Sequence, residues 1–282
     1  MRYIEEKIIS RYPEGVKKDS FQPMLYGYLQ DRSPELKNSK TRKAVIICPG
    51  GAYRFKSDRE GEPIAMRFLA AGMQAFVLQY SVAPSQYPAA LLELAEAVVL
   101  LRKNAEEWDI DPEQIMICGF SAGGHLCASL GTLWKDPVIS ESMDCSEYLW
   151  KPDGMILCYP VISMAEYGHE ESRQLLMGDR ISEELSERLS LQNQVSDETI
   201  STFIWSTQED EQVPVENTLM FAAALQKHHV VFELHIYEKG EHGLALCDST
   251  TEDKASQVMP DNADWITQAI RWIWRRCMMD RR

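Results

Sequence analysis

The stretch Cys118–Gly124 reads CGFSAGG and places a serine between two glycines in the pattern Gly-x-Ser-x-Gly. A β-rich run, IMIC, leads into it, and a helix-forming run, AGGHLCASLGTLW, follows the serine. A cramped turn between a strand and a helix lifts a serine hydroxyl above the sheet edge and brings the positive helix N-terminus beside it. Gly119 and Gly123 are then required because side chains there would collide. This context predicts a nucleophilic Ser121, although the pentapeptide alone also fits an ordinary turn.

Short apolar runs alternate with segments of helical period from Lys43 onward, and this alternation predicts parallel strands covered by helices. The expected strands cover residues 43–48, 73–80, 114–119, 154–160, 201–207 and 231–237. The expected helices cover residues 63–72, 87–108, a segment from about 122, 215–228 and 262–276. The first forty residues, with MLYGYLQ (24–30), are expected to add antiparallel edge strands. The predicted class is α/β, with a mostly parallel central sheet and helices on both faces.

The length of 282 residues fits one large α/β domain, and 45% hydrophobic and 26% charged residues are ordinary for a globular chain. We therefore expect a single domain over residues 1–282. Residues 163–199 are polar, lack strand signals and contain helical patches such as SEELSERLS. We interpret this segment as a small cap inserted over the C-terminal edge of the sheet.

The formal net charge is −14, and no basic stripe is present that could neutralise phosphates. Nucleic acid and anionic membrane surfaces are therefore not expected as partners. The opening MRYIEEKIIS is interrupted by two glutamates, unlike a signal peptide, and no apolar run is long enough to cross a bilayer. The seven cysteines lack a CxxC pair or a spacing suited to zinc, so no metal is expected. A reduced, cytoplasmic protein is the simplest interpretation.

A serine hydroxyl is a weak nucleophile at neutral pH, so the hypothesis requires a histidine base and a carboxylate that orients it. His242 lies in the glycine-flanked loop KGEHGLAL (239–246), just past the last expected strand, where it can reach over the sheet edge. His125 follows Ser121 on the same helix and is expected to point away, in a structural role. The remaining histidines end a helix, lie in a strand or lie in the expected cap: His228, His229, His235 and His169.

The carboxylate is expected between serine and histidine in chain order, after another strand end. STQEDEQVPVEN (206–217) holds three acids there, Glu209, Asp210 and Glu211, and spacing alone does not rank them. We select Asp210 because it stands three residues before the VP that opens the next helix. Its short side chain can point inward at that turn while its neighbours face solvent. Chain order, strand ends and the histidine loop all agree with this choice.

Acyl transfer also requires fixed N–H donors for the oxyanion that forms on the former carbonyl oxygen. CPGGAY (48–53) follows the first buried strand and offers small residues whose amides can approach a ligand closely. We assign these donors to Gly51 and Ala52, together with Ala122 from the serine turn. A dinucleotide site is disfavoured because GxGxxG is missing, and a plain tight turn is the alternative.

With these parts in place, the chain resembles the α/β-hydrolase superfamily, and within it the serine esterases that include acetyl xylan esterases and short-chain carboxylesterases. The resemblance rests on five ordered blocks: VIICPGGAY, GFSAGGHLCASL, CYPVIS, TFIWSTQEDEQVPVEN and ELHIYEKGEHGLAL. It implies that Ser121 is the nucleophile, Asp210 the orienting acid and His242 the general base, with no cofactor. The chain departs from the common HGGG motif by Pro49 and Ala52. The methyl group of Ala52 is expected to narrow the acyl pocket and favour acetyl.

The leading hypothesis is a serine esterase that removes acetyl groups from acetylated xylan or xylo-oligosaccharides through an acyl-enzyme. Tyr53 and Trp150 are candidate surface aromatics that would stack on sugar rings, with core packing as the alternative for each. A lipase-like carboxylesterase is disfavoured by the polar cap, and a peptidase by the length of the chain. A catalytically inert binding protein is the third alternative, because a fold does not determine a function. The helical surface and edge strands permit a homodimer.

Overall fold

The computed structural model describes residues 1–36, 41–145 and 148–279, without the side chains of 277–279. Its central element is a sheet with the strand order β1-β2-β4-β3-β5-β6-β7-β8. The strands are β1 (Arg2–Lys7), β2 (Met24–Leu29), β3 (Arg42–Cys48), β4 (Gln74–Gln79), β5 (Ile110–Phe120), β6 (Gly154–Cys158), β7 (Thr202–Thr207) and β8 (Phe232–Tyr237). The pairs β1–β2 and β2–β4 are antiparallel, whereas β3 to β8 all run parallel to one another. The predicted mostly parallel sheet with antiparallel N-terminal edge strands is confirmed.

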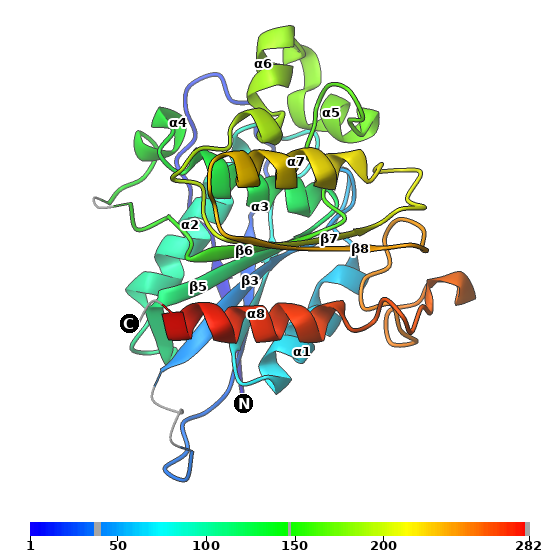
Figure 1. The fold of residues 1–282 in the computed structure, drawn as a ribbon. Coiled ribbons are helices and arrows are strands. Elements are labelled where there is room, and N and C mark those ends of the chain that lie inside the picture. The colour runs from blue at the N-terminus through cyan, green and yellow to red at the C-terminus, as the bar shows by residue number, and fades with distance from the viewer. Residues whose placement is uncertain (37–40, 146–147, 280–282) are drawn as a thin grey trace.

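Helices cover both faces of this sheet, as predicted (Figure 1). One face carries α2 (Ala89–Lys103), α3 (Ala122–Leu133) and α7 (Glu216–Lys227). The opposite face carries α1 (Glu62–Ala70) and α8 (Trp265–Met279). Both faces are covered and every residue of β3 is buried, which explains why the strand is continuously apolar from Ala44 to Cys48.

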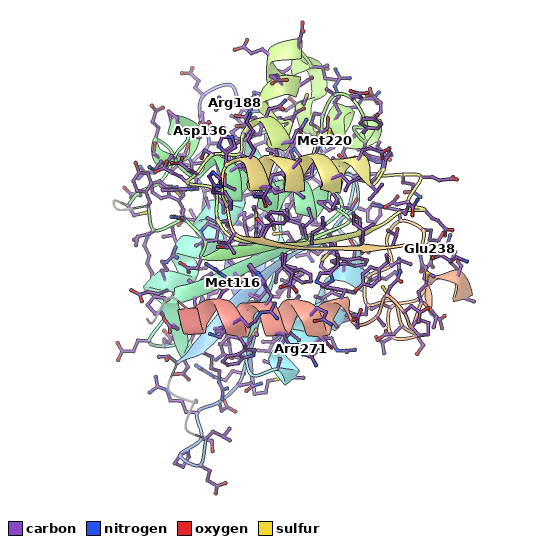
Figure 2. All side chains as sticks on the ribbon, viewed as in Figure 1. Met116, Asp136, Arg188, Met220, Glu238 and Arg271 are labelled. Carbon is purple, nitrogen blue, oxygen red and sulfur yellow. The ribbon has the colours of Figure 1, made fainter. Side chains whose placement is uncertain are left out.

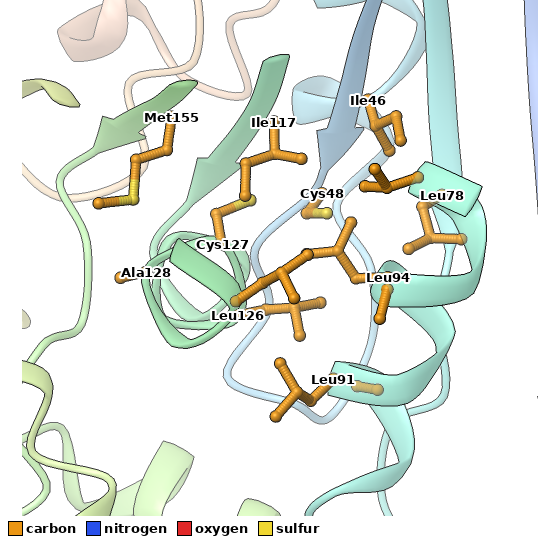
Figure 3. Close-up of a cluster of buried hydrophobic side chains, with 14 of the residues drawn as sticks. Ile46, Cys48, Leu78, Leu91, Leu94, Ile117, Leu126, Cys127, Ala128 and Met155 are labelled. Carbon is orange, nitrogen blue, oxygen red and sulfur yellow. The ribbon is translucent and has the colours of Figure 1, made fainter. Parts of the chain in front are cut away.

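The helix that follows Ser121 is anchored by its apolar side chains (Figure 3). Leu126 and Cys127 of α3 lie in the same buried cluster as Ile117 of β5, Cys48 of β3 and Leu91 of α2. Full burial of a leucine-sized side chain stabilises a fold by roughly 1.5–3 kcal/mol. The start of α3 is therefore fixed against the strands whose ends form the site described below.

Two predicted strands differ from the structure in length. The strand expected over 114–119 begins earlier, at Ile110, where its first residue pairs with β3 across a register shift. The strand expected over 154–160 ends at Cys158, because the next residue, Tyr159, adopts a positive φ of 37°. The other predicted strands and most helices agree with the structure within three residues.

The long helix predicted over 87–108 is shorter, since α2 ends at Lys103. The side-chain amide of Asn104 donates to the carbonyl of Leu100 (2.9 Å), which satisfies a helix-end acceptor, and the following residues form turns. A short helix, α4 (Pro137–Ser140), was not predicted from the sequence.

Residues 163–199, the predicted cap, connect β6 to β7 and form no strand in the structure. They contain the helices α5 (Glu170–Met177) and α6 (Glu183–Arg188) and the 3₁₀ helices η2 (Gly178–Arg180) and η3 (Leu191–Asn193). In Figure 1, α5 and α6 lie beyond α7 on the same side of the sheet. Figure 2 labels one attachment of this segment: Arg188 of α6 forms an ion pair with Asp136, the N-cap residue of α4.

Three further observations concern the class of protein. Among the described residues, no helix is both long and apolar enough to cross a membrane. The described cysteine side chains are free thiols, and all but Cys145 are buried; the side chain of Cys277 lies outside the described part. Within the described ranges, no three His, Cys, Asp or Glu side chains are grouped as a metal site would require.

Candidate active site

Loops from one edge of the sheet carry the predicted site residues. Gly51 and Ala52 follow β3, Ser121 follows β5, Asp210 follows β7 and His242 follows β8. These four strands all belong to the parallel part of the sheet, so their carboxyl ends lie at the same edge. In open α/β sheets this edge is where ligands bind.

The turn at Ser121 is strained and tightly packed. Ser121 has φ 52° and ψ −117°, a conformation that residues other than glycine rarely adopt. A Cβ atom on Gly119 would lie 2.1 Å from the carbonyl oxygen of Gly123, and one on Gly123 would lie 2.1 Å from that of Cys48. The Ser121 N–H donates to the carbonyl of Cys158 (3.0 Å), which fixes the turn against β6. The predicted steric reason for both glycines is confirmed.

The structure brings Ser121, His242 and Asp210 into one hydrogen-bonded relay. His242 Nε2 lies 2.8 Å from Ser121 Oγ, and His242 Nδ1 lies 2.6 Å from Asp210 Oδ2. A carboxylate on the Nδ1 side keeps the proton on that nitrogen, so Nε2 can accept the proton of the serine hydroxyl.

Asp210 is the acid that the fold turns inward. Its side chain is buried, with a residue exposure of 4%, whereas Glu209 and Glu211 are exposed. Its Oδ1 atom accepts the backbone N–H groups of Gln212 (3.0 Å) and Val213 (2.9 Å), which leaves Oδ2 directed at His242. The two backbone donors thus hold the carboxylate in the orientation that the histidine requires.

Two of the three residues predicted to supply oxyanion donors line the pocket that holds Ser121. Gly51 and Ala52 line the same pocket as Ser121 and have positive φ angles of 128° and 56°. The carbonyl of Gly51 accepts the N–H groups of Arg54 (2.8 Å) and Phe55 (3.2 Å), which closes the loop into a turn. Among the described residues, none accepts a hydrogen bond from the N–H of Ala52 or from that of Ala122 at the start of α3. Both groups are therefore free to donate to a ligand.

The pocket beside Ser121 is small, with a volume of about 250 Å³. Its lining residues are Gly51, Ala52, Phe55, Ser57, Arg59, Glu60, Ser121, His169, Glu171, Gln212, His242 and Gly243. A larger hollow of about 740 Å³ lies between β1, β2 and α1, but neither the serine nor the histidine lines it. We assign the candidate active site to the smaller pocket because it alone of the two is lined by Ser121 and His242.

Several polar side chains in this pocket were not identified from the sequence. His169 and Glu171 reach it from the segment 163–199, and burial lowers the pKa of His169, with nearby His242 adding to this effect. Glu171 forms an ion pair with Arg54. Arg59 donates to the carbonyl of Gly243 (3.0 Å), beside the candidate base. No sequence motif marks these side chains, because tertiary packing rather than local sequence brings them to the pocket.

The proposed surface position of Tyr53 is wrong. Its ring is only 3% exposed, and its hydroxyl donates to His125 Nδ1 (3.0 Å) inside the core. His125 in turn contacts the carbonyl of Leu189 through Nε2 (2.9 Å), and burial lowers its pKa to about 4. His125 is therefore structural, as expected. Trp150 is likewise buried, and its Nε1–H donates to the carbonyl of Trp134 (2.7 Å).

Comparison with known sequences points to one family. The BD-FAE family model matches residues 32–225. The endo-1,4-beta-xylanase B of Butyrivibrio fibrisolvens is 38% identical over 81% of this chain and 35% of its own length. An acetylxylan esterase of Xylanibacter ruminicola is 29% identical over 82% of this chain and 46% of its own length. The chain thus spans about a third to a half of these curated relatives.

Two solved structures are similar to this protein over nearly its whole chain. The acetyl ester-xyloside bifunctional hydrolase of Caldicellulosiruptor lactoaceticus is 39% identical, with a TM-score of 0.78 over 91% of this chain and 89% of that one. The carboxylesterase Cest-2923 of Lactobacillus plantarum is 26% identical, with a TM-score of 0.83 over 98% of both chains.

The mostly parallel sheet, the strained serine turn after β5 and the acid and histidine on later strand-end loops together define an α/β hydrolase. The likeness to the two solved hydrolases supports the same class. Within this class the chain belongs to the BD-FAE family, whose model covers more than half of its residues.

Proposed function

We propose that the protein is a serine-dependent carboxylic ester hydrolase. The observation that carries this proposal is the continuous relay from Ser121 Oγ through the imidazole of His242 to the buried carboxylate of Asp210. A binding protein would require neither the strained serine nor the inward acid. Relatives and structural neighbours described as esterases support the same reaction class.

In the proposed acylation step, Ser121 Oγ attacks the ester carbonyl carbon while His242 Nε2 takes the hydroxyl proton. Asp210 stabilises the imidazolium that forms. When the tetrahedral intermediate collapses, the bond to the alcohol oxygen breaks, and His242 returns the proton to that oxygen. Water then attacks the acyl-enzyme with His242 as its base, which releases the carboxylic acid and restores the serine.

The oxyanion of the tetrahedral intermediate would receive hydrogen bonds from the N–H groups of Gly51 and Ala52 and from that of Ala122. The last of these lies at the N-terminus of α3, where the helix dipole adds to the stabilisation of negative charge. Removing one such donor from an enzyme typically costs 10²–10³-fold in kcat, roughly 3–4 kcal/mol.

Within this reaction we propose acetyl groups on acetylated xylan or xylo-oligosaccharides as the substrate. The pocket is small, and the Ala52 methyl group borders it, which favours a short acyl chain. Relatives described as an acetylxylan esterase, an endo-1,4-beta-xylanase and an acetyl ester-xyloside hydrolase support a carbohydrate ester. Arg59, Glu171 and Gln212 supply donors and acceptors of the kind that sugar hydroxyl groups pair with.

The remaining predictions refine this proposal. We propose that residues 163–199 act as a cap, because His169 and Glu171 from this segment line the pocket. The single domain, the homodimer and the cytoplasmic location stay predictions from the sequence.

The proposed substrate class is tested by comparing kcat/KM for acetylated xylan, acetylated xylo-oligosaccharides, long-chain aryl esters and aminoacyl amides. We expect a preference for acetyl esters over long-chain esters and no turnover of amides. A preference for long acyl chains would replace the carbohydrate proposal by a lipase-like activity. Turnover of amides would instead indicate a peptidase.

A further inference from the structure

A buried carboxylate outside the relay lines the same pocket. Glu60 lies at the end of the 3₁₀ helix η1 (Asp58–Glu60) and is only 4% exposed. Its Oε2 atom accepts the backbone N–H of Gly50 (2.8 Å), and its Oε1 atom accepts the hydroxyl of Tyr159 (2.7 Å). Burial raises the pKa of Glu60, while these two donors act in the opposite direction.

The second partner, Tyr159, connects Glu60 to the histidine loop. Besides donating to Glu60, the Tyr159 hydroxyl accepts the backbone N–H of Ala245 (2.9 Å). Its ring packs edge-on against the imidazole of His242, with 5.1 Å between the ring centroids and an interplanar angle of 72°. Tyr159 is fully buried and has a positive φ of 37°, so the chain bends at the end of β6 to place it there.

The first partner, Gly50, belongs to the loop that carries the candidate oxyanion donors. A Cβ atom on Gly50 would lie 2.8 Å from Glu60 Oε2 and 2.9 Å from the Ser121 Cβ atom, so the loop, the carboxylate and the serine are in close contact. Hydrogen bonds thus run from Gly50 through Glu60 and Tyr159 to Ala245. They join the loop after β3 to the loop after β8 beneath the reacting atoms.

We propose that Glu60 is a positioning residue of the active site, which holds the oxyanion loop and the His242 loop in register through Gly50 and Tyr159. This inference rests on the proposed esterase function. Removing a carboxyl group from water costs free energy, and this carboxyl group recovers part of it through the two hydrogen bonds that join these loops. Displacing catalytic groups by about 1 Å can lower a rate about a hundredfold.

Two conservative variants test the proposal, Glu60→Gln and Tyr159→Phe. Glutamine keeps the size of Glu60 and can still accept from Gly50, but its NH₂ group can only donate to the Tyr159 hydroxyl oxygen, which leaves the hydroxyl proton without its acceptor. Phenylalanine keeps the ring on His242 and removes the hydroxyl. For each variant we expect kcat for an aryl acetate to fall roughly 10–100-fold, with KM changed less than about threefold. In the double variant the loss should be no larger than that of the worse single variant, because both break one network.

Glu93 offers a matched control, because neither it nor its partners line this pocket. It is also fully buried, and it accepts a backbone N–H, from Ser81 (2.6 Å), and a tyrosine hydroxyl, from Tyr12 (2.9 Å). Glu93→Gln should lower thermal stability as Glu60→Gln does but leave kcat within about twofold of the wild type, since none of its partners lies at the active site.

A measurement that is independent of turnover completes the test. Amide hydrogen exchange of the peptide over residues 239–246 should become about tenfold faster or more in Tyr159→Phe, because the Ala245 N–H loses its acceptor. Unchanged kcat and unchanged exchange in both variants would overturn the inference and assign Glu60 to stability alone. Independent, multiplicative losses of kcat in the double variant would also overturn it. Failure of the esterase proposal is seen separately, as full activity in Ser121→Ala.

Discussion

The imidazole of His242 lies 2.8 Å from the hydroxyl of Ser121, although the two residues are 121 positions apart in the chain. Both sides of this contact are fixed by the backbone. Ser121 is held at a positive φ by the packing of Gly119 and Gly123, and His242 follows the end of β8. The contact therefore follows from the fold.

Asp210→Asn should lower kcat for an aryl acetate by about 10⁴-fold while leaving the fold intact. The amide oxygen can still accept the N–H groups of Gln212 and Val213, so its NH₂ group would face His242 Nδ1. That contact places the histidine proton on Nε2, where the imidazole can no longer accept the serine proton. Steady-state kinetics and circular dichroism check the two parts of the prediction.

The neighbouring acid provides the control for this variant. Glu211 is exposed, so Glu211→Gln should keep kcat within about twofold of the wild type. An equal loss in both variants would show that the charge of the loop matters rather than the contact of Asp210 with His242.

Ala52→Gly should widen the accepted range of acyl chains. The Ala52 side chain borders the pocket at a φ of 56°, a conformation that glycine adopts without cost. We expect the ratio of kcat/KM for aryl butyrate to that for aryl acetate to rise several-fold, in line with the 1–3 kcal/mol that about one methylene group contributes in an apolar pocket. An unchanged ratio would mean that another residue limits the acyl site.

Gly123→Ala should prevent stable folding, because the added Cβ atom would lie 2.1 Å from the backbone oxygen of Cys48. Gly243→Ala separates this clash from backbone strain. Gly243 has a φ of 77°, and a Cβ atom there would meet nothing within 4 Å, so we expect a loss of only about 1–2 kcal/mol. Urea unfolding of both variants checks the prediction, and similar losses for the two would contradict it.

His125 should make the folded state less stable in mild acid. Burial lowers its pKa from 6.5 to about 4, so between these values the unfolded chain binds a proton that the folded chain does not. The free energy of unfolding should therefore fall as the pH drops from 6.5 towards 4, by at most about 1.4 kcal/mol per pH unit from this group. His125→Gln should show a smaller fall over the same range in urea unfolding, and an identical pH dependence would contradict the assignment.

The order of strands and helices was predictable because apolar runs and helical periods leave a direct pattern in the sequence. The residues at which helices and strands end were harder to predict. At the end of α2 the Asn104 side chain bonds back to the carbonyl of Leu100, and at the end of β6 the backbone bends at Tyr159. Neither feature has a period that a sequence pattern could detect.

The candidate relay was predictable since Ser121, Asp210 and His242 each follow a strand in the expected order. The residues that surround these three side chains could not be predicted. Tyr53 is aromatic and near a glycine-rich loop, which suggested a sugar platform, but tertiary packing places its ring against His125 in the core. Glu60 lines the pocket instead. Nothing in the sequence around Glu60 distinguishes it from an acidic residue on the surface.

The central claim, that Ser121 is the nucleophile, is tested most directly by a fluorophosphonate probe followed by mass spectrometry of the digested protein. The account predicts one adduct per chain, on Ser121, together with loss of aryl acetate hydrolysis. Ser121→Ala should fold normally, remain unlabelled and lose activity by about 10³-fold or more. Normal hydrolysis by Ser121→Ala, or an adduct on another residue of the folded wild type, would contradict the account.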